Sequence, residues 1–410
     1  MIIFDKLTFV GMMGMTKLID ITGKAIAGEW GNDDETGTDI PVLRTTNFTN
    51  EGVVNFDNVV TRSISKKKLE EKYLRPGDII IEKSGGSDKQ PVGRVVFYEG
   101  PENTFLFNNF TGVLRVKDKS KWFPRYVFYS LYSNYRRGGT RAFENKTTGL
   151  HNLKTDDYVS RFEVADANFS EQIRICILLD KAAGIIKARQ KQLSALDDLI
   201  KARFVEMFGD PEHNSKILPV QPLDSLCSVG SSKRIYQNEQ SADGVPFWRI
   251  SDLVSKMDTG VVDSGLFIPE EKYVELKQAG LVPVAGDILV TSRGTLGRCY
   301  IIQEEDRFYF QDGMISWLSN YTESITPLYL QHLFTMNDFR KQIDGMQAGS
   351  TVAYLSIAML KKLRIMVPSK EEQIKFASFV SQIDKSKFVI QKSLDETHLL
   401  FDSLMQKYFG

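Results

Sequence analysis

The stretch EQIRICILLDKAAGIIKARQKQLSALDDLIKARFVEMFG, residues 171–209, occurs a second time in diverged form as EQIKFASFVSQIDKSKFVIQKSLDETHLLFDSLMQKYFG, residues 372–410. The two segments align without a gap, begin with EQI, end with FG and contain no proline. Mainly apolar residues recur in both at alternating steps of three and four, which is the heptad pattern of a helix that packs along another helix. Each segment is therefore predicted to be one helix of about 58 Å.

Capping signals mark the ends of both predicted helices. Asn168 stands three residues before Glu171, and Ser369 stands three residues before Glu372, which is the capping-box arrangement. Glycine, aspartate and proline at 209–211 end the first helix.

The simplest partner for each helix is the other copy. Packing of each helix on its own domain alone is the alternative, but a helix of this length extends past a domain of about 150 residues. The residues expected at the helix-pair interface are Leu193, Leu196, Ile200, Met207, Ile390, Leu394, Phe401 and Leu404.

The segments that precede the two helices are also repeated. IPVLRTTNF at 40–48 matches VPFWRISDL at 245–253, and RPGDIII at 75–81 matches VAGDILV at 284–290. A VGR triplet follows the second motif in one copy, and LGR follows it in the other. The same order of motifs about 200 residues apart indicates one structural unit present twice.

Short β-branched or aromatic runs between glycines and prolines predict that both bodies are rich in strands. The predicted strands lie at 41–43, 78–81, 93–98, 111–116, 287–290 and 298–302, and further helices are expected at 124–135 and 327–343. The fold class is thus α+β, with two strand-rich domains and two long antiparallel helices between them. The expected division is 1–167 for the first domain, 168–209 for the first helix, 210–368 for the second domain and 369–410 for the second helix.

Composition narrows the class of protein. Lysine plus arginine equals aspartate plus glutamate at 52 each, so a uniformly basic DNA-coating protein is disfavoured, although a reader with one basic face is not. Cys176, Cys227 and Cys299 form no CxxC or Cys/His pair and are expected to be buried thiols in a reducing cytoplasm. No signal peptide or apolar run of about 20 residues is evident, so we expect an unprocessed soluble protein.

The sequence contains no convincing catalytic or metal site. A phosphate-binding glycine loop is missing, and so is the Asn/Asp-Pro-Pro-aromatic motif of adenine methyltransferases. Asp78, Glu82 and Lys83 resemble a nuclease cluster, but the second copy replaces the last two with Thr291 and Ser292. The four histidines lack metal-ligand spacing. We therefore expect no catalytic residues, no metal and no bound cofactor.

The duplicated series of an IPxxR-like segment, a PGD or AGD strand, a GR turn and an EQI…FG helix resembles the specificity subunit of Type I restriction-modification enzymes. The resemblance covers roughly Lys17–Gly410. It implies that each strand-rich body is a target-recognition domain for one half of a bipartite site in double-stranded DNA, with the helix pair as a coiled-coil spacer. It also implies two methyltransferase subunits that carry S-adenosylmethionine, and motor-nuclease subunits in complexes that cut unmodified DNA. A rod of this length can span half-sites about 34 to 36 Å apart.

Candidate DNA contacts lie in two loops of each body, where glycine permits close backbone approach and polar side chains suit phosphates and base edges. The first loop follows the PGD or AGD strand, and the second precedes the long helix. The candidates are Ser84, Ser87, Lys89, Gln90, Arg136, Arg137, Arg141, Lys146, Thr147, Ser292, Arg293, Thr295, Gln347, Ser350 and Thr351.

Two other functions stay open at this point. The chain could be a self-sufficient restriction-methylation enzyme, against which the missing cofactor and nuclease motifs count. It could also be a coiled-coil scaffold that binds no DNA. The recognised bases do not follow from the sequence under any of these functions.

Overall fold

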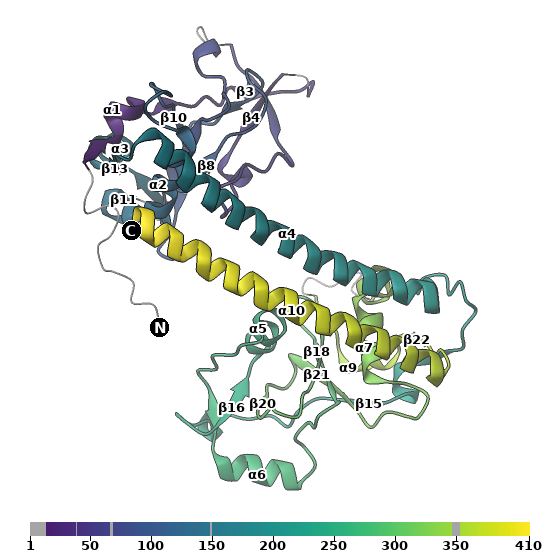
Figure 1. Ribbon diagram of the computed structural model, residues 1–410. Coiled ribbons are helices and arrows are strands. Elements are labelled where there is room, and N and C mark those ends of the chain that lie inside the picture. Colours follow the sequence, from purple (N-terminus) through teal and green to yellow (C-terminus); the bar gives the residue numbers. More distant parts are fainter. Residues whose placement is uncertain (1–13, 38, 66–68, 148–149, 347–352) are drawn as a thin grey trace. The chain divides into compact units, whose positions relative to one another are not determined.

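The computed structural model describes residues 14–37, 39–65, 69–147, 150–346 and 353–410 and consists of two compact units (Figure 1). Unit 1 comprises Met1–Gln190 and Lys392–Gly410, and unit 2 comprises Lys191–Gln391. The two long helices, α4 (Phe169–Phe208) and α10 (Lys370–Phe409), each contribute one part to each unit. The four-segment division expected from the sequence stays a prediction, because these units divide both helices.

Unit 1 is strand-rich, as predicted. Its antiparallel sheet β2-β10-β6-β8 consists of Ile26–Ala27, Thr111–Leu114, Ile79–Glu82 and Val95–Phe97. The sheet β3-β5-β4-β9 consists of Asn32–Asp33, Val60–Ser63, Ile40–Leu43 and Leu106–Phe107, and β4 and β9 run parallel. The smaller sheets are β11-β12-β7, with Glu144–Thr147, Leu150–Leu153 and Ser84–Gly86, and β1-β13, with Met15–Lys17 and Glu163–Ala165. The helices are α1 (Leu18–Thr22), α2 (Pro124–Arg136) and α3 (Thr155–Arg161).

Unit 2 repeats much of this plan. Its antiparallel sheet β15-β21-β18-β19 consists of Ser228–Gly230, Ile315–Ser319, Ile288–Thr291 and Cys299–Ile301. The sheet β17-β16-β20 consists of Phe267–Ile268, Val245–Trp248 and Tyr309–Phe310, again with a parallel pair, and β14 (Val220–Pro222) pairs with β22 (Arg364–Met366). The helices are α5 (Ile250–Thr259), α6 (Glu270–Gln278), α7 (Pro327–Thr335), α8 (Asn337–Gly345) and α9 (Ile357–Lys361).

The repeated sequence motifs occupy equivalent places in the two units. The aspartate of each PGD or AGD motif closes the turn before a central strand, where Asp78 accepts a hydrogen bond from Arg75 N at 2.8 Å. Asp287 accepts one from Val284 N at 3.0 Å in the same way. The predicted strands are confirmed to within one or two residues at most ends, and so is the α+β class.

The two long helices begin and end where their caps predicted. Asn168 accepts a hydrogen bond from Glu171 N at 2.9 Å, and Ser369 accepts one from Glu372 N at 3.3 Å. The reciprocal bond of a full capping box forms only in α10, because the side chain of Glu171 instead binds Arg174. Gly209 adopts a left-handed φ of 81° just past α4, as helix-ending glycines do.

The helix predicted at 327–343 is two helices, so this prediction is wrong in one respect. Met336 adopts an extended conformation between α7 and α8. The change of direction allows Phe334 of α7 and Phe339 of α8 to pack with ring centroids 4.9 Å apart, which buries both in the core of unit 2.

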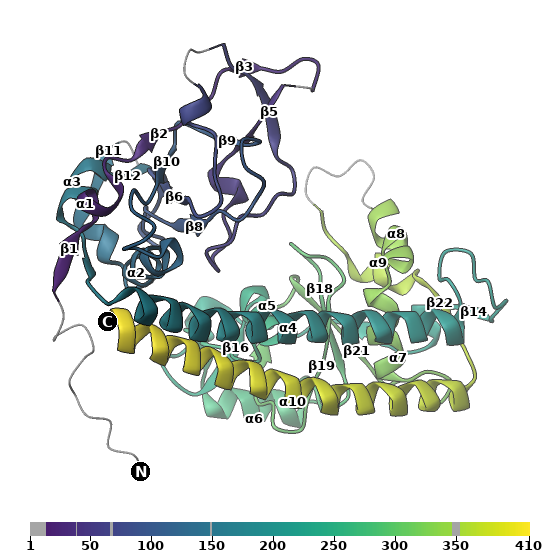
Figure 2. The same cartoon turned by 45° about the horizontal axis from the view of Figure 1, so that its top comes forward.

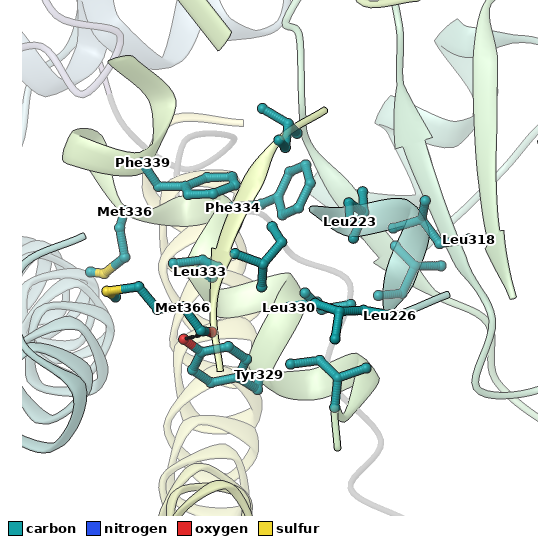
Figure 3. Close-up of a cluster of buried hydrophobic side chains, with 14 of the residues drawn as sticks. Leu223, Leu226, Leu318, Tyr329, Leu330, Leu333, Phe334, Met336, Phe339 and Met366 are labelled. Carbon is teal, nitrogen blue, oxygen red and sulfur yellow. Dashed lines mark hydrogen bonds between the residues drawn. The ribbon is translucent and has the colours of Figure 1, made fainter. Parts of the chain in front are cut away.

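The core of unit 2 is centred on α7 (Figure 3). Tyr329, Leu330 and Leu333 are fully buried, and Leu223 and Leu226 lie in the same cluster. Each such side chain contributes about 1.5–3 kcal/mol by leaving water. The end of α4 and the start of α10 pack against this core.

Within the described ranges, no helix is long and apolar enough to cross a lipid bilayer.

Candidate nucleic-acid interface

The structure of unit 1 brings together the two loops that the sequence identified separately. Ser84–Gly86 forms β7, which pairs with β12, and β12 pairs in turn with β11, the strand that contains Lys146 and Thr147. Ser84 of the first loop and Lys146 and Thr147 of the second therefore belong to one three-stranded sheet.

The loop after β7 is held by a buried carboxylate. Glu144 accepts a hydrogen bond from Val92 N at 3.1 Å and lies 2.9 Å from Nδ1 of His151. Nε2 of the same imidazole lies 3.6 Å from the Asp88 carboxylate. Because the side chains of Glu144 and His151 are buried, these contacts stabilise the conformation of the loop from its buried side.

The loop itself is a tight turn with exposed side chains. Ser87 N donates to Gln90 O at 2.7 Å, and Gln90 N donates to Ser87 Oγ at 3.1 Å. Gly86 is needed here, because a Cβ atom at this position would lie 2.5 Å from Val92 N. Ser87 and Lys89 are exposed, whereas the Gln90 side chain donates to Tyr135 Oη at 3.3 Å.

The arginine-rich segment of unit 1 makes contacts inside the protein. Arg136 lies 2.6 Å from the Asp402 carboxylate, and Arg137 donates to Phe409 O at 2.6 Å. Both guanidinium groups thus bind the last turns of α10, where cations satisfy free carbonyls and the helix dipole. Arg141 donates to Asp88 O at 3.2 Å and so supports the loop after β7.

In unit 2 the loop after β18 has a related position. Leu355 N donates to Ser292 O at 3.0 Å, just as Leu153 N donates to Lys83 O at 2.9 Å in unit 1. The Ser292 side chain is buried and bonded to Ser316, which leaves it no direct path to a ligand.

Arg293 and Thr295 are the exposed candidates of this second loop. The Arg293 guanidinium lies 5.2 Å from the centre of the Tyr354 ring. Gln347, Ser350 and Thr351 lie outside the described residues.

The expected helix-pair positions all lie on the less exposed side of α4 and α10. Ile200, Leu394 and Phe401 are buried, and the other five are half-buried. Ile200 belongs to the same core cluster as Phe376 of α10, and Met207 packs against that cluster. The assignment of all eight residues to one interface stays a prediction.

Contacts within each unit show that α4 and α10 pack together in opposite directions. In unit 1, Arg174 near the start of α4 donates to Tyr408 Oη at 3.5 Å, near the end of α10. In unit 2, Phe204 near the end of α4 lies 5.5 Å from Phe376, near the start of α10. Figure 2 shows the two helices side by side.

Sequence reasoning missed the buried glutamine of each EQI motif. Gln172 accepts from Phe123 N at 2.8 Å and donates to Ala167 O at 2.8 Å. Gln373 accepts from Thr326 N at 2.8 Å and donates to Pro368 O at 3.0 Å. Each glutamine ties the start of a long helix to the start of α2 or α7, and its identical place in both copies was the available signal.

The aromatic anchor residues near the helix ends were also missed. Phe204 and Phe208 are fully buried against Tyr329, with ring centroids 5.4 and 5.0 Å away. In unit 1, Phe409 lies 5.2 Å from Tyr126. The FG ending shared by both copies was the signal for these contacts.

Part of the chain is similar to known proteins. Residues 219–397 match the family model of the Type I restriction modification DNA specificity domain. A type I restriction enzyme specificity subunit of Haemophilus influenzae is 28% identical over 179 residues, which is 42% of this chain and 43% of that protein. Residues 219–397 are therefore similar to the Type I restriction modification DNA specificity domain, and the chain spans less than half the length of the specificity subunit that it matches.

Solved structures share the fold over nearly the whole chain. The S subunit of a Type I restriction-modification system from M. genitalium superposes with a TM-score of 0.56 at 17% identity and covers 99% of this chain and 98% of that one. A chain from a study of complex assembly and conformational transition of the type I R-M system gives 0.53 at 13% identity, with 97% of each chain covered. At these identities the likeness concerns the fold alone.

The match to the family model lies within residues 219–397, and for unit 1 the solved structures show a likeness of fold. The nuclease-like carboxylates of unit 1 are bound by arginines, since Asp78 pairs with Arg115 at 2.7 Å and Glu82 with Arg94 at 3.5 Å. Burial raises the pKa of Glu82 above its usual range, and Arg94 opposes this effect. These contacts explain both acids as parts of the frame of the domain.

Proposed function

We propose that this chain is the DNA-reading subunit of a Type I restriction-modification complex, in which each strand-rich domain reads one half of a bipartite site. The observation that carries the proposal is the duplicated frame. In each unit an exposed polar loop follows the central strand of the PGD or AGD motif and packs beside the segment that leads to a short helix. Two readers of the same build suit a site in two parts.

Four of the exposed side chains are the best candidates for contact with DNA. These are Ser87 and Lys89 in unit 1 and Arg293 and Thr295 in unit 2. Lysine suits phosphates, and arginine suits guanine edges or phosphates. Gln90, Arg136, Arg137, Arg141 and Ser292 have partners inside the protein and support the frame in this proposal, while Ser84, Lys146, Thr147, Gln347, Ser350 and Thr351 stay candidates.

The chemistry is assigned to partner proteins. Two methyltransferase subunits carry S-adenosylmethionine and methylate adenine, and motor-nuclease subunits join to cut unmodified DNA. The chain itself is non-catalytic in this proposal and binds no cofactor. Its three free cysteines fit the reducing cytoplasm in which such a complex would act.

One surface of unit 2 supports the recruitment of a methyltransferase subunit. A groove of about 590 Å³ lies between α7 and α10 and is lined by Leu328, Val380, Phe388 and Val389. The last two side chains are 72% and 66% exposed. Large apolar side chains exposed side by side are typical of protein interfaces.

Genome-wide mapping of N6-methyladenine, in a host with the gene intact and deleted, tests the proposal. We expect one bipartite motif to lose its methylation on deletion. Labelled S-adenosylmethionine provides the control, because methyl transfer to DNA by the isolated chain would show a self-sufficient enzyme. A gel shift at stated salt distinguishes the remaining alternative, since a complex with methyltransferase subunits that binds no DNA would indicate a scaffold.

A further inference from the structure

A cavity of about 650 Å³ in unit 1 is lined by three lysines that the sequence did not single out. It lies between β2, the junction of β6 and β7, and the start of α3, and Lys24, Lys83 and Lys154 contribute to its wall. Asp156 and Asp157 complete its charged lining.

The positive charges in this cavity exceed the negative ones. None of the three lysines forms a salt bridge with a carboxylate of the described residues, whereas Asp157 lies 2.7 Å from Arg161 outside the cavity lining. The ammonium groups therefore face one uncommitted carboxylate, Asp156. Such a site attracts an anion.

Lys83 is the half-buried member of the group. Its aliphatic chain crosses Gly112, where an added Cβ atom would lie 3.3 Å from Lys83 Cδ. Burial lowers the pKa of Lys83, and Asp156 opposes this effect. An anion in the cavity would stabilise the charged form of this lysine.

Unit 2 has serine at all three equivalent positions. Lys83 and Ser292 follow matching strands, and their carbonyls accept from Leu153 N and Leu355 N. Lys154 and Ser356 are the N-cap residues of α3 and α9.

The strand pairing gives the third equivalent position. Ile26 pairs with Val113 in unit 1, and Gly230 pairs with Trp317 in unit 2, so Ser228 corresponds to Lys24.

The serines of unit 2 show that the fold does not require lysine at these positions. In unit 2, Ser292 bonds Ser316 at 2.8 Å, and Ser356 caps α9 through Met359 N at 3.2 Å. The same frame thus forms without positive charge at these positions. Three lysines at one cavity therefore call for an explanation beyond stability.

We propose that the lysine cavity of unit 1 binds a phosphate group of the DNA backbone, a contact that unit 2 does not make. This inference rests on the proposed DNA-reading function. Its position supports it, because Lys83 directly precedes β7 and Lys154 directly follows β12, the strands of the candidate reading sheet. Lysine suits phosphate as a point charge and carries no sequence preference there.

The test compares DNA binding by the full chain, assembled with its methyltransferase subunits, with that of two cavity variants. The first is Lys24→Ser/Lys83→Ser/Lys154→Ser with Gly112→Ser, which copies the arrangement of unit 2. The second is the single change Lys83→Gln, which tests the cavity even if the larger variant fails to fold. Lys119→Gln, at an exposed lysine of the same unit outside the cavity, is the matched control.

We expect the slope of log affinity against log salt to become shallower by about 0.9 in both cavity variants. The ratio of affinities at 50 and 200 mM salt then falls about threefold, equally for duplexes with and without the recognised motif. The methylated motif stays unchanged.

An unaltered salt slope in both cavity variants would overturn the inference, as would an equal change in Lys119→Gln. A slope that changes only when inorganic phosphate is added would show a site for free phosphate and would also overturn it. Failure of the unmodified complex to bind DNA would instead reject the proposed function. The outcomes for the two proposals are thus distinguishable.

Discussion

In unit 1 the start of α2 is tied to α4 by Gln172, and in unit 2 the start of α7 is tied to α10 by Gln373 with the same set of backbone partners. Beside the candidate reading loops the two units differ in their side chains, with lysines at one cavity of unit 1 and serines at the equivalent places of unit 2. Contacts that build the frame therefore persist between the copies, whereas the side chains proposed to bind phosphate diverge. This contrast provides a way to separate structural residues from reading residues.

The ends of the long helices also differ between the units. Phe208 is fully buried among three aromatic rings of unit 2, whereas Phe409 retains 8% exposure and, in the part of the chain that the structure describes, contacts the ring of Tyr126. Unit 1 compensates with charge, because Arg136 and Arg137 bind the end of α10. The end of α4 in unit 2 is thus held by aromatic packing. The end of α10 in unit 1 is held in addition by an ion pair and by a hydrogen bond to a backbone carbonyl.

The largest expected effect comes from this packing difference. Phe208→Ala should lower the free energy of unfolding by about 3–5 kcal/mol, because it leaves a cavity in a closely packed aromatic cluster. Phe409→Ala should cost less, since the Phe409 ring packs against fewer aromatic rings than that of Phe208. Urea denaturation of the full chain measures both, and an equal or larger loss for Phe409→Ala would contradict the comparison.

The shared glutamines test the common frame. Gln172→Leu and Gln373→Leu should each lower the free energy of unfolding by about 1–3 kcal/mol, because buried backbone groups lose their partners. Gln190→Leu, at an exposed position of α4, is the control and should have little effect. If only one of the two substitutions lowered the free energy of unfolding, the two glutamines would not have equivalent structural roles in the two units.

The reading loops should act separately on the two half-sites. Lys89→Ala and Arg293→Ala should each weaken binding by about 1 kcal/mol, roughly fivefold in affinity. Arg293→Ala should also relax the sequence preference in one half of the motif only. Competition assays with half-site variants give the readout, and relaxation of both halves by one substitution would refute independent readers.

The smallest effect concerns pH and arises in unit 2. Burial lowers the pKa of His332 to about 4, with Lys387 lowering it further and Asp197 opposing. Because the unfolded chain then binds the proton more strongly, stability is full above about pH 6.5 and is lost as the pH falls towards 4. Between pH 7 and 6 the free energy of unfolding should fall by less than about 1 kcal/mol. In His332→Gln this fall should be smaller. If the free energy of unfolding depended on pH identically in the wild type and in His332→Gln, this histidine would not be the cause of the acid-induced loss of stability.

The sequence alone was sufficient for the features that local patterns encode. The heptad spacing, the caps at Asn168 and Ser369 and the glycine at 209 predicted both long helices almost to the residue. Strand runs around Asp78 and Asp287 were equally clear, because turn residues and short β-branched runs are local properties of the sequence. The duplication supplied the architecture, since a repeated order of motifs requires a repeated unit.

The tertiary structure decided which of the polar residues are free to bind a ligand. Arg136 and Arg137 looked like a basic patch, yet they bind the end of α10 more than 260 residues along the chain, and no local pattern encodes such a contact. Ser292 turned inward, while Lys83 became part of a cavity only after β2, β6 and α3 came together. Long-range packing sets the burial and charge of each side chain, and these properties determine what a surface can bind.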